Sequence, residues 1–183
     1  MTGVELVVSL VVLGLVASGI VGVLWSVAGS AERFDRAEVT REAAAAVRAV
    51  DGGIRSGTAL YPPTDGGMGL VVASAPDART GVARCEQWRI VGVALERREW
   101  RSDWRTSGGV GMWRTVARDV VNRAPPGAMP VPAFAFGTGT AAKDVVVSIV
   151  VNHGVDASHS VRVTRRVPVS SVAPEGRCDP VPN

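Results

Sequence analysis

Hydrophobic and polar positions divide the chain into two parts. Residues 6–29 are almost uninterrupted apolar sequence, and Glu5 is the only charged side chain before Glu32. At ~1.5 Å per residue such a stretch can cross a hydrocarbon layer of ~30 Å, so the pattern predicts a membrane-spanning helix. It is too long for a cleaved signal peptide and lacks a basic leading region, so we expect it to belong to the working protein.

A second apolar pattern follows at helical spacing, formed by Val39, Ala43, Ala46, Val47, Val50 and Ile54. The two patterns together predict one helix from Thr2 to about Val50, roughly 70 Å long. Thr2 and Glu5 fit a capping box at its start, and residues 51–53 (Asp-Gly-Gly) provide a stop. The first half also carries small residues at the spacing of close helix packing, namely Gly14, Ser18, Gly22 and Ser26.

Beyond Gly53 the hydrophobic pattern changes to a period of two residues. The strand candidates are residues 69–74, 83–95, 131–136, 144–151 and 160–169, and the last two form a predicted hairpin around residues 152–159. Residues 113–121 fit either a strand or a short helix. The predicted fold class is α+β, with a long N-terminal α-helix packed on an antiparallel β-sheet. The expected segments are 1–29 (hydrophobic helix), 30–53 (amphipathic half), 54–172 (β domain) and 173–183 (Pro-rich tail).

The two cysteines and the charge pattern bear on the compartment. Cys85 and Cys178 fit no metal-binding spacing, so one disulfide is expected in an oxidising exterior, with two buried free thiols as the alternative. Closing so long a loop is worth roughly 4 kcal/mol. Three arginines follow the apolar stretch, which alone would place the domain in the cytoplasm. The conflict disappears if a basic leader before Met1 was removed after insertion.

The N-terminal pattern resembles the type IV pilin superfamily. Met1, Thr2, Val4 and Glu5 match the processed N-terminus of that family, whereas Gly3 departs from the usual leucine. Residues 85–90, and residues 116–122 leading into 134–136, resemble the larger minor-pilin or pseudopilin branch of high-GC Gram-positive bacteria. The resemblance implies that a prepilin peptidase cleaves before Met1 and methylates its amine. Single-pass subunits in the membrane would then be assembled by an inner-membrane platform into an extracellular filament at the cell surface.

Glu5 has two readings in this context. A carboxylate in an apolar bundle is tolerable only if it is paired, and the resemblance implies pairing with the Met1 amine of a neighbouring subunit. The local alternative is completion of the Thr2 capping box, and both roles can coexist. The expected function is a filament subunit whose partners are copies of itself and other pilins. The alternatives are a minor pilin or pseudopilin that primes a secretion or DNA-uptake machine, and a single-pass binding module that never polymerises.

Candidate chemistry elsewhere is sparse. Trp100, Arg101, Trp104 and Arg105 interleave rings and cations, which could stack bases and contact phosphates of DNA. Acidic neighbours dilute this charge, and the formal net charge of +3 is far from that of a dedicated nucleic-acid binder. We therefore favour arginine–tryptophan stacking or a contact between subunits. His153 and His159 flank a loop containing Asp156 without an adjacent third ligand, so no metal is expected. No nucleophile motif or phosphate-binding loop indicates an enzyme or a cofactor.

Overall fold

The structure is a computed structural model, and it describes residues 13, 18, 36–137, 144–154, 159–169 and 178. The chain divides into two units, Met1–Glu38 and Val39–Asn183, and nearly all of the described residues belong to the second unit. Ser18 is helical. Several predicted positions lie outside the described residues, namely Met1, Thr2, Glu5, Gly14, Gly22 and Ser26, as do the predicted boundaries at residues 29 and 172.

The predicted fold class is wrong. The described part of the chain is mostly β-structure, with one helix of more than four residues, the long helix (residues 36–56), packed on two antiparallel sheets instead of one. Among the described residues no helix is long and apolar enough to cross a membrane. The long helix has a charged exposed side, which carries Arg36, Glu38, Arg41 and Arg48, and the predicted span over residues 6–29 lies outside the described residues except at Leu13 and Ser18. A helix with such a face is amphipathic and lies on a protein core.

The first sheet is a meander of five strands in sequential order. It contains β1 (Ala59–Leu60), β2 (Gly69–Ala73), β3 (Arg84–Val91), β4 (Ala94–Arg101) and β5 (Arg114–Ala117), each antiparallel to the next. The predicted strand over residues 83–95 is divided in the structure, because it covers β3, a turn and the start of β4. Gly92 makes the turn with a φ of 56°, a conformation that glycine adopts at little cost. Residues 113–121, which were ambiguous, contribute β5.

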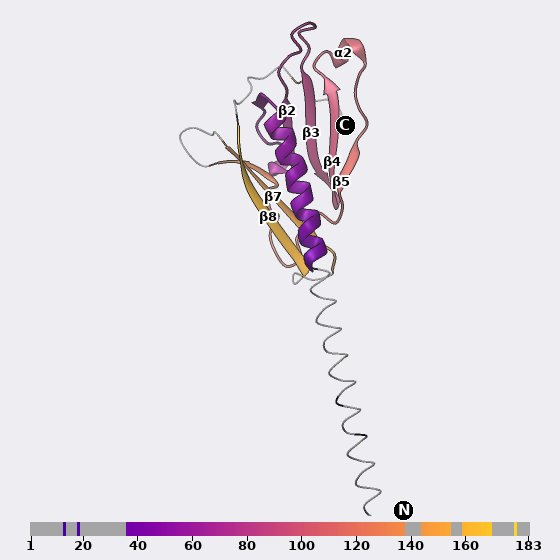
Figure 1. Cartoon of the computed structure of the whole chain (residues 1–183), viewed down its shortest axis with the longest axis vertical. Coiled ribbons are helices and arrows are strands. Elements are labelled where there is room, and N and C mark those ends of the chain that lie inside the picture. The colour runs from indigo at the N-terminus through magenta and orange to yellow at the C-terminus, as the bar shows by residue number, and fades with distance from the viewer. Residues whose placement is uncertain are drawn as a thin grey trace, which may run out of the picture. The chain divides into compact units, whose positions relative to one another are not determined.

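The second sheet contains β6 (Phe134–Phe136), β7 (Asp144–Asn152) and β8 (Ser160–Pro168), again antiparallel and in sequential order. β7 and β8 form the predicted pair. Figure 1 shows the long helix in front of the strands, with β7 and β8 on one side of it and β3 to β5 on the other.

The core lies where the long helix meets both sheets. All six residues of the predicted helical stripe, from Val39 to Ile54, are at most 3% exposed. They share one hydrophobic cluster with Trp88 and Ile90 of the first sheet and with alternate valines and Ile149 of β7. Burying each large side chain of this kind stabilises the fold by roughly 1.5–3 kcal/mol.

Two polar contacts fix the long helix to its surroundings. Asp51, only 7% exposed, pairs with Arg55 at 2.8 Å and with Arg165 of β8 at 3.1 Å. The second pair accounts for Arg165, a charged residue at the alternate position between Val163 and Val167 of β8. Nearer the start of the helix, Glu42 lies 2.8 Å from Nε2 of His153.

Candidate functional site

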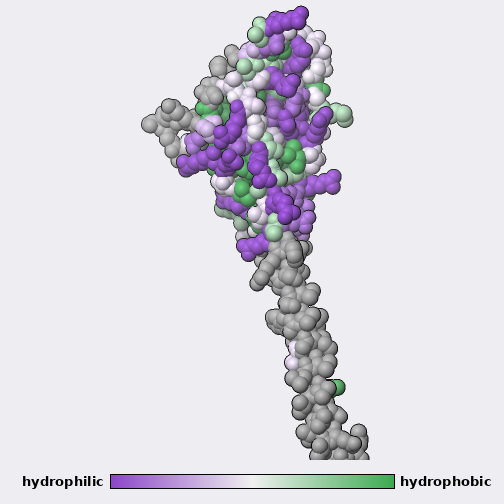
Figure 2. Space-filling view, in the orientation of Figure 1, coloured by the Kyte–Doolittle hydropathy of each residue, from purple (hydrophilic) through white to green (hydrophobic). Residues whose placement is uncertain are grey.

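A cavity of about 680 Å³ opens on one face of the first sheet, next to the end of the long helix. We call it the arginine cavity because four arginines line it: Arg79, Arg84, Arg97 and Arg101. Two carboxylates, Asp77 and Glu86, line it as well, so the lining carries two more positive than negative groups. In Figure 2 hydrophilic residues gather over the strands of this sheet.

The hairpin register places most of these charges on one face. Arg84 lies opposite Arg101, Glu86 opposite Glu99, and Trp88 opposite Arg97. Because alternate residues of a strand point to the same side, all of these side chains share one face. The long helix covers this face at the buried Trp88 and ends at residue 56, where Ser56 lines the cavity.

Asp77 organises the turn that carries Arg79. Its Oδ1 accepts hydrogen bonds from the amides of Arg79 and Thr80 at 3.0 and 2.8 Å and from the Thr80 hydroxyl at 3.0 Å. These bonds, with the two from Thr80 foremost, lower the pKa of Asp77 because they favour the charged carboxylate. The turn therefore holds Arg79 at the cavity while Asp77 remains ionised.

The remaining arginines are held to different degrees. Arg97 donates to Oε2 of Glu86 at 2.9 Å and also pairs with Glu99. Arg101 contacts both carboxylate oxygens of Asp103 at 3.1 Å, and this pairing raises the pKa of Arg101 and lowers that of Asp103. Arg84 is held most loosely, 3.9 Å from Glu99 with a side chain that is 75% exposed.

Glu86 is the buried acid of the cavity, at 8% exposure. Burial raises its pKa, although Arg97 acts in the opposite direction. Its Oε1 makes no hydrogen bond of standard geometry, and neither does the indole N–H of Trp88, although that N–H still lowers the pKa of the carboxyl.

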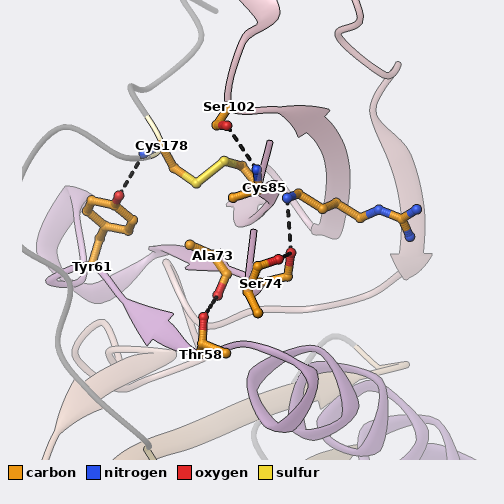
Figure 3. The surroundings of a disulfide bond; sticks show 10 residues. Thr58, Tyr61, Ala73, Ser74, Cys85, Ser102 and Cys178 are labelled. Carbon is orange, nitrogen blue, oxygen red and sulfur yellow. Dashed lines mark hydrogen bonds between the residues drawn. A yellow bond between two sulfur atoms is a disulfide. The ribbon is translucent and has the colours of Figure 1, made fainter. Parts of the chain in front are cut away.

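A disulfide lies on the opposite face of β3. Cys85 is joined to Cys178, as expected from the sequence, with 5.8 Å between their Cα atoms. The amide of Cys178 donates to the hydroxyl of Tyr61 at 2.6 Å, as Figure 3 shows. Both cysteines belong to a small hydrophobic cluster with Trp100, and all three are at most 2% exposed. The bond is therefore shielded from solvent and fastens residue 178 to the middle of the first sheet.

Comparison with protein-family models, curated proteins and solved structures finds no match for this chain. The resemblance of residues 1–5 to processed pilins therefore rests on the sequence alone.

The four residues considered as a possible nucleic-acid contact, Trp100, Arg101, Trp104 and Arg105, do not form one surface. Trp100 is buried beside the disulfide, and Trp104 packs against the same cluster. Arg101 instead lines the arginine cavity, on the other side of the sheet. The guanidinium of Arg105 lies 5.5 Å from the ring of Trp104. A buried ring such as that of Trp100 is not accessible to a nucleic-acid base.

Arginine–tryptophan stacking does occur, and it centres on a residue that the sequence did not single out. The guanidinium groups of Arg89 and Arg98 lie 3.6 and 4.3 Å from the centre of the Trp113 ring. Arg98 is 5% exposed, and burial, reinforced by the nearby charge of Arg89, lowers its pKa. Such stacks stabilise by roughly 0.5–2 kcal/mol.

The predicted histidine loop contains no metal site in the described residues. No group of three or more His, Cys, Asp or Glu side chains there is arranged to hold a metal ion. His153 instead contacts Glu42 and lies 4.0 Å from Asp119, and Asp156 lies outside the described part of the chain.

The arginine cavity itself was missed in the sequence. The sequence does contain a pattern that indicates it, because charged residues alternate along both strands. They are Arg84 and Glu86 in β3, and Arg97, Glu99 and Arg101 in β4. That pattern predicts a charged sheet face once Gly92 is recognised as the turn of a hairpin.

Proposed function

We propose that this chain is a structural subunit of an extracellular filament of the type IV pilus class. The observation that carries the proposal is Glu5, the only charged side chain ahead of the apolar residues 6–29. In a filament interior this carboxylate requires a cationic partner. The partner is the Met1 amine of a neighbouring copy, created when a prepilin peptidase removes a leader.

The disulfide of the described domain supports an extracellular location. Its two cysteines are joined, and disulfides persist in oxidising compartments. In the proposed cycle the subunit waits in the cytoplasmic membrane through its apolar segment. An assembly platform then adds it to copies of itself and to other pilins.

The test is Glu5→Val, with Glu32→Gln as the control for loss of a negative charge outside the apolar segment. We expect Glu5→Val to enter the membrane normally and to yield no filaments in the sheared surface fraction. Glu32→Gln should assemble as the unmodified chain does. Filaments of normal number and length from Glu5→Val would contradict the proposed pairing.

A second candidate is a minor pilin or pseudopilin that primes a secretion or DNA-uptake machine, favoured by the resemblance of residues 85–90 and 116–122 to that branch. Mass analysis of purified filaments separates the two functions, because a major subunit is the principal component and a priming subunit is present in trace amounts. The same spectrum would show whether Met1 is methylated. A precursor without a basic leader ending before Met1 would favour the third reading, a binding module that never polymerises.

A further inference from the structure

We propose that the arginine cavity binds an acidic oligosaccharide, a sugar chain that carries carboxylate groups. This binding activity goes beyond the proposed filament function and depends on the described domain alone.

Two arginines of the cavity are available to an anion. Arg84 has a mostly exposed side chain and only a distant ion pair with Glu99, and Arg79 makes no ion pair within the part of the chain that the structure describes. A guanidinium presents paired N–H donors that match the two oxygens of a carboxylate. Arg97 and Arg101 are already paired with acids, so they add positive potential more than they add open donors.

The hydroxyl groups of the cavity act as acceptors. Ser56, Ser74 and Thr80 each donate their hydroxyl proton to an oxygen of their own segment, at 2.9, 3.2 and 3.0 Å. The Ser74 oxygen already accepts from the amide of Arg84 at 3.0 Å, and the Thr80 oxygen from the amide of Val82 at 3.4 Å. Each of the three hydroxyl oxygens still has an acceptor position for a ligand. The carboxylate of Glu86 is buried and already accepts from Arg97, so it contributes negative charge to the cavity but no open acceptor. A matching ligand therefore brings many O–H donors.

This combination of groups discriminates between ligand classes. A bare or densely charged anion would bring its charge against Asp77 and Glu86, which line the same cavity. A sugar acid separates its carboxylates by hydroxyl groups, so it can satisfy the arginines and the acceptors together. No aromatic side chain is among the residues that line the cavity, so it offers no platform on which nucleic-acid bases could stack. Its volume of about 680 Å³ accommodates a short oligosaccharide.

The binding test uses the full chain in non-ionic detergent micelles and titration calorimetry with trigalacturonate. The methyl ester of trigalacturonate keeps the ring hydroxyls and loses the charge, whereas inorganic phosphate keeps charge without the sugar scaffold. A short single-stranded oligonucleotide tests the nucleic-acid alternative. We expect trigalacturonate to bind at least about tenfold more tightly than each of the other three, and to bind more weakly as salt rises.

Two variants locate the site. Arg79→Gln and Arg84→Gln should each weaken trigalacturonate binding about tenfold, as expected for loss of a charge-assisted hydrogen bond. Arg114→Gln is the matched control, because Arg114 is an exposed arginine of the same sheet outside the cavity, and it should bind as the unmodified chain does. Equal binding of the methyl ester, of phosphate or of the oligonucleotide would overturn the proposal. Equal loss of affinity in Arg114→Gln, or unchanged affinity in both cavity variants, would overturn it too.

Discussion

At the scale of single residues, Gly53 sets how closely the long helix approaches the first sheet. A Cβ atom at this position would lie 2.4 Å from Oε1 of Glu86 and 3.1 Å from the Trp88 indole, both closer than ordinary contact. The neighbouring Gly52 has open space in the same direction. The two glycines are adjacent in sequence and both lie inside the helix, yet only one of them is required for packing.

This difference predicts that replacement by alanine changes the free energy of unfolding in opposite directions at the two positions. Gly53→Ala should lower the free energy of unfolding by about 1–3 kcal/mol, because the added methyl group displaces the buried side chains of Glu86 and Trp88 or the helix itself. Gly52→Ala should raise it by up to about 1 kcal/mol, because alanine favours the helix and meets no neighbour. Urea unfolding of both variants measures the two values. Equal effects would show that helix propensity alone decides both positions.

At the scale of elements, Asn122 takes the place of a strand partner along β7. Its amide nitrogen donates to the carbonyls of Val131 and Ser148 at 3.0 and 2.7 Å, and its amide oxygen accepts from Val150 at 2.9 Å. β6 pairs with β7 only as far as Val147, and beyond that point these bonds satisfy the carbonyl of Ser148 and the amide of Val150. The main chain of residues 119–121 bonds to the backbone of Val150 and Asn152. The side chain is fully buried, which makes every one of its bonds costly to lose.

Asn122→Ala should therefore lower the free energy of unfolding by roughly 2–4 kcal/mol, because buried backbone groups lose their partners. Hydrogen exchange gives the local signature, with faster exchange of the Val150 amide. Thr115→Ala, at an exposed position of β5, should leave both quantities nearly unchanged. Protection of Val150 in Asn122→Ala equal to that in the unmodified chain would contradict this role.

Features of these elements that depend on residues close together in the sequence were predictable, whereas features that depend on distant segments were not. The stripe from Val39 to Ile54 and the alternation in β7 and β8 depend on near neighbours, and both were predicted. The split into two sheets depends on contacts between distant segments, which no periodicity reports. The arginine cavity depends on the same kind of information, because the long helix must end at residue 56 for that sheet face to stay open.

At the scale of the whole molecule, the disulfide joins distant parts of the chain. Cys85 lies in the third of five strands of the first sheet, and Cys178 follows the last strand of the second, 93 residues later. A bond with that separation removes many conformations from the unfolded chain. Its contribution to stability should therefore be large, even though both sulfur atoms lie in a small cluster.

Replacing both cysteines by alanine should lower the free energy of unfolding by roughly 4 kcal/mol. Urea unfolding of the full chain in detergent measures this loss, and the unmodified chain in strong reductant should show a similar decrease. An unfolding midpoint that neither change moves would mean that the bond contributes nothing beyond local packing.

The sequential strand order also bears on how the domain comes to be folded. Each strand pairs with its neighbour along the chain, and such local pairing favours fast folding. During synthesis Cys85 emerges long before Cys178, and domains generally fold from the N-terminal side first. The five-stranded meander can thus form while Cys85 still awaits its partner. Oxidation would then come last, locking a finished domain instead of guiding its folding.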